Sequence, residues 1–255
     1  MGASPASADG ELHEMPFPPP LGPAKPEGMA RWHLLITGFG PFPGIAENSS
    51  AWLAEALATH DSSSRLGPAL QTKVFATEWA EVTRLGPHLL DQHRPRLILH
   101  FGLSKSAKGF RIEGSAHNVI DLREDARGAM PSAACALPLE HPRLDTQVPA
   151  TRLAKHLRAQ ALPATASRSA GTYLCNYLYY LSLDWARRQK ASSDVCFVHI
   201  PPLARHGGPL SEAELLRGAD LIVRYLLAFA EKRDQAAALG PRDTSKLAAA
   251  RQVWC

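Results

Sequence analysis

The chain has 255 residues, of which 45% are hydrophobic and 20% are charged, and its formal net charge is +4. This composition can bury one substantial core, and a single domain of about 200 residues fits it better than two small ones. The basic residues are scattered, without the aromatic-interleaved stripe typical of nucleic-acid binding. No apolar run reaches the roughly 18 residues that cross a membrane. We therefore expect a globular protein with neither nucleic acid nor a membrane as partner.

The four cysteines are Cys135, Cys175, Cys196 and Cys255, and they show no C-x-x-C motif and no metal-type spacing. This pattern favours free thiols in a reducing compartment, so we expect a cytoplasmic protein. The histidines show no H-E-x-x-H or comparable spacing, and no metal site is predicted. Cys135 and Cys196 are interpreted as small buried hydrophobes.

Residues 1–30 are rich in Pro, Ala, Gly and Ser, which predicts a disordered leader. From there on, apolar runs and amphipathic stretches alternate. The predicted elements are a strand at 32–37, a helix at 50–58, a strand at 73–76, a helix at 80–93, a strand at 96–101, a helix at 151–160, a helix after Cys175, a strand at 194–199 and a last helix that ends at about residue 232.

The last helix opens on Ser211-Glu-Ala-Glu214, which resembles a capping box. The alternation of strands and helices predicts a single three-layer α/β/α domain over residues 31–233, with a mainly parallel twisted sheet. Residues 234–255 contain Gly240-Pro241 and are expected to form a mobile tail.

A candidate nucleophile, Cys175, ends the segment Ser-Arg-Ser-Ala-Gly-Thr-Tyr-Leu-Cys at residues 167–175, directly before an apolar, helix-compatible stretch. The thiolate is the attacking species, so its pKa must be lowered from about 8.5. A cysteine in the first turn of a helix meets unpaired N–H groups and the positive end of the helix dipole. His199 ends an apolar run that reads as a buried strand, and it could supply the base. Glu113 could orient the imidazole.

These segments, in the order Glu, Cys, His, resemble the pyroglutamyl peptidase I family, the pyrrolidone-carboxylate cysteine peptidases. Gly102, Glu113, Ala116 and Asn118 sit at the offsets of the family's acid segment, and residues 167–176 match its cysteine segment in full. The spacing of Cys175 and His199 also matches the family.

An N-terminal motif extends the resemblance. Residues 37–44 read Thr-Gly-Phe-Gly-Pro-Phe-Pro-Gly and are similar to the family's opening, followed by its Asn-x-Ser at Asn48 and Ser50. Matching segments run from about residue 32 to about residue 230.

The resemblance implies a cysteine peptidase that removes an N-terminal pyroglutamyl residue, with Cys175, His199 and Glu113 as catalytic residues and no metal or organic cofactor. The substrate's ring is small and uncharged, so its recognition needs apolar walls and a few backbone hydrogen bonds. The expected substrate-binding residues are Phe39, Phe42, Asn48, Leu103 and Tyr173. The expected partner is a peptide with N-terminal pyroglutamate; association into a homo-oligomer stays open.

The chain departs from the family at a few positions. Gly114 stands where the family has a basic residue, Lys105 where it prefers a small one, and Pro43 where it has glycine. Glu124 replaces an apolar residue that helps to wall the substrate ring. A carboxylate there costs desolvation energy unless it is paired, so we expect it to turn away from the ring or to pair with Arg123 or Arg127.

The sequence also bears on three other functions. The motif at residues 38–43 superficially resembles a dinucleotide loop, but Pro43 occupies the third glycine position and no acidic residue ends a second strand. NAD binding is therefore rejected. A catalytically drifted homologue that acts as a binding module, and an amidohydrolase for another N-acyl group, remain as alternatives.

Overall fold

A six-stranded sheet runs through the middle of the computed structural model, which describes residues 33–59, 70–138, 141–189 and 193–238. Its strands are, in spatial order, β2 (Leu70–Phe75), β1 (Leu34–Phe39), β3 (Leu97–Leu103), β8 (Asp194–Ile200), β4 (Phe110–Glu113) and β7 (Ala164–Ser167). The pairings within this sheet are parallel except that of β4 with β8. Two short strands, β5 (Ser115–His117) and β6 (Arg143–Asp145), form a separate antiparallel pair.

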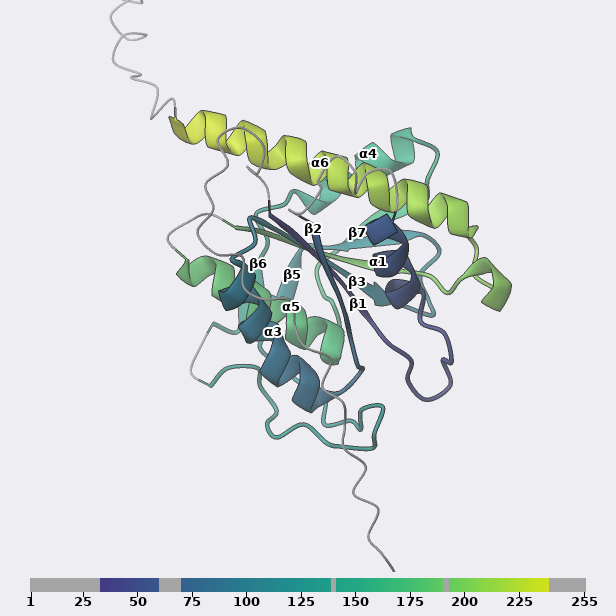
Figure 1. Ribbon diagram of the computed structural model, residues 1–255, viewed down its shortest axis with the longest axis vertical. Helices are drawn as coiled ribbons and strands as arrows, with labels where there is room; N and C mark the ends of the chain where they lie inside the picture. Colours follow the sequence, from purple (N-terminus) through teal and green to yellow (C-terminus); the bar gives the residue numbers. More distant parts are fainter. Residues whose placement is uncertain (1–32, 60–69, 139–140, 190–192, 239–255) are drawn as a thin grey trace, which may run out of the picture.

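Helices cover both faces of the sheet, so the predicted three-layer α/β/α architecture is confirmed (Figure 1). One face carries α1 (Ser49–Thr59), α4 (Ala150–Ala159) and α6 (Glu212–Ala238). The other carries α3 (Trp79–His93) and α5 (Leu174–Arg188). A short 3₁₀ helix, η2 (Ala204–His206), follows β8. Strands β1 and β8 are buried along their whole length, which explains their near-continuous apolar sequences.

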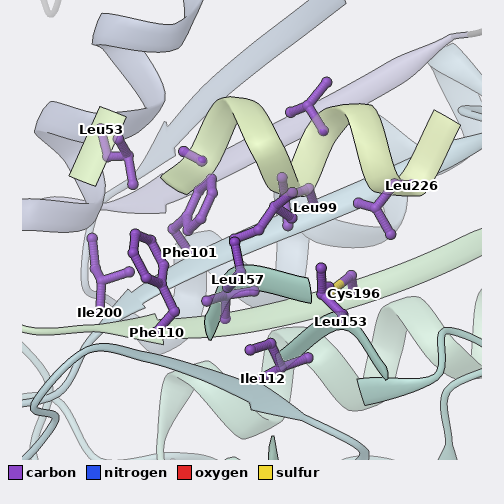
Figure 2. Packing of buried hydrophobic residues seen from close by; sticks show 14 of the residues in the cluster. Leu53, Leu99, Phe101, Phe110, Ile112, Leu153, Leu157, Cys196, Ile200 and Leu226 are labelled. Atoms are coloured by element: carbon purple, nitrogen blue, oxygen red, sulfur yellow. The ribbon is translucent and has the colours of Figure 1, made fainter. Parts of the chain in front are cut away.

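The core between the sheet and α1, α4 and α6 is built from branched aliphatic and phenylalanine side chains (Figure 2). Cys196 on β8 is fully buried among them, as its interpretation as a small hydrophobe predicts. Gly218 lets α6 approach the sheet, because a Cβ there would lie 2.2 Å from Cζ of Phe110. A side chain at this position would push α6 off the core.

The structure contains each predicted helix and strand, with shifted ends, and adds four short strands. The predicted capping box forms: Ser211 N donates to Glu214 Oε2 at 2.9 Å, and Glu214 N donates to Ser211 Oγ at 3.2 Å. The helix it opens continues to Ala238, beyond the predicted end. Strands β4, β5, β6 and β7 are absent from the prediction, because each is only three or four residues long and lacks an apolar run.

The predicted leader at 1–30 lies outside the described residues. Of the predicted tail at 234–255, residues 234–238 belong to α6, and the rest lies outside the described residues. Within the described parts, no helix is both long and apolar enough to cross a bilayer. Among the described residues, Cys135, Cys175 and Cys196 are free thiols. Cys135 is only partly buried, so its interpretation as a small buried hydrophobe is wrong.

Candidate active site

The site lies at the carboxyl ends of the parallel strands, the edge at which open α/β sheets place their ligands. Strands β3 and β8 are in register so that Gly102 pairs with His199. Helix α5 begins at this edge, with Tyr173 as its N-cap residue and Cys175 in its first turn. The parallel pairing thus brings together residues that are far apart in the sequence.

Strand β4 supplies the acidic residue. It pairs antiparallel with β8, with Arg111 opposite His199 and Glu113 opposite Phe197. Glu113 Oε1 accepts a hydrogen bond from His199 Nδ1 at 2.8 Å, and the carboxylate is fully buried. A carboxylate acceptor fixes the proton on Nδ1, which leaves Nε2 as the free nitrogen of the ring.

Cys175 packs against the backbone beside His199. A Cβ built on Gly102 would lie only 2.8 Å from Cys175 Sγ and 2.9 Å from Cζ of Phe197. Only glycine therefore leaves room for the sulfur at this point of β3. Since Gly102 is the ladder partner of His199, the thiol lies next to the strand segment that carries the imidazole. The structure thus brings together Cys175, His199 and Glu113.

The protonation of the thiol differs from the expectation. Cys175 keeps part of its surface open, yet burial raises the pKa of its thiol to about 12, and the charge of Glu113 adds to the rise. Arg111 and Arg123 act in the opposite direction. The helix start therefore does not make a resting thiolate here, and the proton must leave as the thiol reacts.

The start of α5 leaves backbone N–H groups without helical acceptors beside Cys175. Gly171 has φ of 83°, a left-handed conformation that favours glycine. The N–H of Tyr177 is bonded to Tyr173 O, and the N–H groups before it in the first turn have no intrahelical acceptor. Asn176 holds the neighbouring loop, accepting from His117 N and donating to the carbonyls of His117 and Val119.

A pocket of about 820 Å³ opens in front of Cys175 and His199. All five residues predicted to bind the substrate lie in its wall: Phe39, Phe42, Asn48, Leu103 and Tyr173. Asn48 also has a structural task, because its amide nitrogen donates to Gly40 O and its Oδ1 accepts from Ser50 N. It holds the turn that carries Phe42.

Comparison with known proteins decides the family. A sequence model described as pyroglutamyl peptidase matches residues 32–207. The chain belongs to the pyroglutamyl peptidase family. Pyroglutamyl-peptidase 1 of Rattus norvegicus is 31% identical over 207 residues, which cover 79% of this chain and 92% of the rat protein. The pyrrolidone-carboxylate peptidase of Thermococcus litoralis is 30% identical over 173 residues, or 66% of this chain and 76% of that protein.

Solved structures of the family share the fold. The pyrrolidone carboxyl peptidase from Thermococcus litoralis superposes with a TM-score of 0.71 at 24% identity, covering 79% of this chain and 96% of that one. The enzyme from Thermus thermophilus gives a TM-score of 0.62 at 30% identity, covering 74% and 97%.

The structure shows the surroundings of two residues that depart from the pyroglutamyl peptidase pattern, Gly114 and Lys105. Gly114 donates its N–H to Ser167 O at 2.7 Å, and a Cβ there would lie 3.1 Å from the same oxygen. The close pairing of β4 with β7 therefore favours glycine. Lys105 lines the pocket from an exposed position, with Nζ 3.9 Å from where a Cβ on Gly44 would lie.

Glu124 is exposed at the rim of the pocket. Its backbone oxygen accepts from Tyr173 Oη at 3.0 Å, and its Oε2 lies near Gly128. The predicted partners are engaged elsewhere: Arg127 pairs with Glu78 at 2.8 Å, and the guanidinium of Arg123 stacks 3.8 Å from the centre of the Tyr173 ring. Glu124 makes no ion pair with the described residues, and its charge is accommodated by exposure to solvent.

Proposed function

We propose that this protein is a cysteine peptidase that removes N-terminal pyroglutamyl residues from peptides, with Cys175 as nucleophile, His199 as general base and acid, and Glu113 as the group that orients the imidazole. The observation that carries the proposal is the hydrogen bond of 2.8 Å between His199 Nδ1 and the buried Glu113, beside a cysteine in the wall of an open pocket. Family membership supports the substrate class.

The reaction would begin with a neutral thiol. His199 Nε2 takes the proton from Cys175 Sγ as the sulfur attacks the carbonyl carbon that joins the lactam residue to the next amine. Glu113 stabilises the imidazolium that forms. His199 then gives the proton to the leaving amine, so that the amide bond breaks and a thioester remains. Water, deprotonated by the same imidazole, hydrolyses the thioester and regenerates the thiol.

The developing oxyanion would be held by free N–H groups in the first turn of α5. Donors of this kind are typically worth about 3 kcal/mol each in the transition state. The lactam ring would lie between the apolar walls given by Phe39, Phe42 and Tyr173, all of which line the pocket. Assembly into a homo-oligomer and a cytoplasmic location stay predictions; the free thiols of the described cysteines are compatible with a reducing compartment.

The test is hydrolysis of a pyroglutamyl fluorogenic amide by the purified full chain. We expect turnover by the wild type and by Cys135→Ala, and loss of turnover in Cys175→Ala with a thermal midpoint close to that of the wild type. Activity in Cys175→Ala would refute the assigned nucleophile. Absence of wild-type turnover on this amide, with turnover of another N-acyl amide, would favour the amidohydrolase alternative.

The alternative of a binding module has less support. A protein that only binds has no physical need for a buried carboxylate that holds a histidine nitrogen beside a cysteine at a pocket. Binding of a pyroglutamyl peptide without turnover in the assay above would establish it.

A further inference from the structure

Arg111 lies closer to the proposed machinery than any sequence motif indicates. It stands on β4 directly opposite His199 in the antiparallel ladder, and it lines the pocket. Side chains of opposite residues share one face of a sheet, and so do residues two apart on a strand. Arg111, Glu113 and His199 therefore share one face, and the side chain of Arg111 is 31% exposed.

Arg111 and His199 bind the same oxygen. Glu113 Oε1 accepts from Arg111 Nε at 2.9 Å and from His199 Nδ1 at 2.8 Å, whereas the buried Oε2 has no hydrogen-bond partner among the described residues. The carboxylate is thus held by two donors on one side. Without Arg111, His199 would be the remaining side-chain donor that orients the Glu113 carboxylate.

We propose that Arg111 is a positioning residue that holds the Glu113 carboxylate in place against His199 and whose charge sets how readily Cys175 gives its proton to the imidazole. This proposal rests on the proposed function. The positive charge of Arg111 favours loss of the proton from Cys175. This effect favours transfer of that proton to the imidazole of His199.

The other charged groups around the site do not duplicate this contact. From the loop beyond β5, Arg123 stacks on Tyr173 of α5. Lys105, Asp121 and Glu124 line the pocket from exposed positions, and Asp125 is bound by backbone N–H groups. From α5, Tyr179 donates its hydroxyl hydrogen to the backbone oxygen of Glu113 and brings no charge.

The experiment compares Arg111→Gln and Arg111→Lys with Arg143→Gln as a matched control. Arg143 makes the same type of pair, two residues along a strand, with Asp145 at 3.0 Å, but it lies on β6 and does not line the pocket. kcat and KM are measured against pH on a pyroglutamyl amide. Loss of a positive charge raises the pKa of neighbouring groups, so we expect the acid limb of kcat/KM to move up by about one pH unit in Arg111→Gln.

In Arg111→Gln we also expect kcat to fall about tenfold with KM within about threefold, because the imidazole is less well held. Arg111→Lys retains the charge and should restore the position of the acid limb. Arg143→Gln should match the wild type. An unchanged acid limb in Arg111→Gln, whatever its thermal midpoint, would overturn the proposal, and a rise in KM alone would make Arg111 a substrate contact instead.

A second readout does not need the substrate. The rate at which iodoacetamide alkylates Cys175 at neutral pH, mapped by peptide mass spectrometry, should fall about tenfold in Arg111→Gln and stay within about twofold in Arg111→Lys and Arg143→Gln. If the wild type hydrolyses no pyroglutamyl amide but alkylation follows this order, the proposed function fails and the role of Arg111 stands. Equal alkylation rates in all variants would refute that role.

Discussion

At the scale of single residues, the position of the proposed nucleophile depends on the absence of a side chain at Gly102. The missing side chain there provides the space that Cys175 Sγ and the Phe197 ring occupy. The residue belongs to the family pattern, but its physical reason appears only when β3 and α5 lie together. A glycine beside a reactive group can therefore be a determinant of geometry without any chemistry of its own.

We expect Gly102→Ala to lower kcat/KM on a pyroglutamyl amide by about a hundredfold, since displacement of a reacting group by about 1 Å costs that much. Gly86→Ala is the control, because a Cβ in the middle of α3 meets Leu178 Cδ1 at an ordinary 3.4 Å. This variant should keep the wild-type rate. Gly102→Ala with wild-type kinetics would show that the sulfur has space that the structure does not indicate.

At the scale of elements, a buried histidine connects the neighbouring strands β1 and β3 to α5. His100 Nδ1 bonds Thr37 Oγ1 of β1 at 2.7 Å, and Nε2 bonds Ser182 Oγ of α5 at 2.9 Å. Burial lowers the pKa of His100 to about 3. The neutral ring thus joins three elements beneath the site, and its protonation would place a charge in the buried core.

This histidine should make stability depend on pH. The unfolded chain takes up a proton on His100 near pH 6.5, whereas the folded chain does not until about pH 3, so acid favours unfolding in this window. The free energy of unfolding is not reduced by this effect above about pH 6.5. It falls by about 1 kcal/mol between pH 7 and pH 5.5. Urea unfolding at both pH values should show a smaller pH difference in His100→Gln than in the wild type. His88→Gln, which replaces an exposed histidine, should leave this pH difference as it is in the wild type. An unchanged pH difference in His100→Gln would show that His100 does not cause it.

Helix α3 is capped by a residue far away in the sequence. Asp125 Oδ2 accepts from Trp79 N at 2.9 Å, and Oδ1 accepts from the N–H groups of Arg127 and Ala129. Burial alone would raise the pKa of Asp125, but these backbone bonds lower it. The carboxylate therefore fastens the rim loop of the pocket to the start of α3.

Asp125→Ala should reduce the free energy of unfolding by about 1–2 kcal/mol through loss of the cap and the turn. It should also raise KM for pyroglutamyl amides, because Arg123 and Glu124 at the pocket rim precede the turn directly. Because the pKa is lowered in the folded state, this stabilisation is present at neutral pH and is lost on acidification. Chemical denaturation and kinetics at pH 7 measure both effects. Equal KM values for Asp125→Ala and the wild type would show that the cap of α3 does not affect the pocket.

At the scale of the whole molecule, the end of α6 is tied to the sheet at the edge opposite the site. Asp194, which begins β8 and is fully buried, pairs with Arg233, and Arg96 before β3 pairs with Asp234. Burial raises the pKa of Asp194 even though Arg233 and Arg96 oppose the rise. The last turns of α6 are therefore part of the domain, which reaches past the predicted boundary at residue 233.

A chain that ends at Lys232 should be less stable than one that ends at Ala238. Removal of Arg233 leaves the buried carboxylate of Asp194 with the longer ion pair to Arg96 at 3.6 Å, and breaking a buried pair costs about 3 kcal/mol or more. Urea denaturation of the two truncated chains measures the difference. Equal midpoints would show that α6 could end earlier without consequence.

The sequence by itself determined the reactive residue types, their order and the alternation of strands and helices. Cys175, His199 and Glu113 lie in short sequence motifs. Strand β8 can be predicted from its apolar run, because a strand buried on both faces needs apolar residues at nearly every position. The capping box at Ser211 is local in the same sense.

Only the tertiary structure decided how these parts meet. Strand β4 is too short to show a period, and its antiparallel pairing with β8, which places Arg111 opposite His199, depends on partners far away along the chain. The end of α6 depends on Asp194 in the same way. The raised pKa of Cys175 follows from burial, which the assembled core imposes and no local motif contains. Local patterns encode elements and chemistry, whereas register, burial and charge partners arise from contacts distant in sequence.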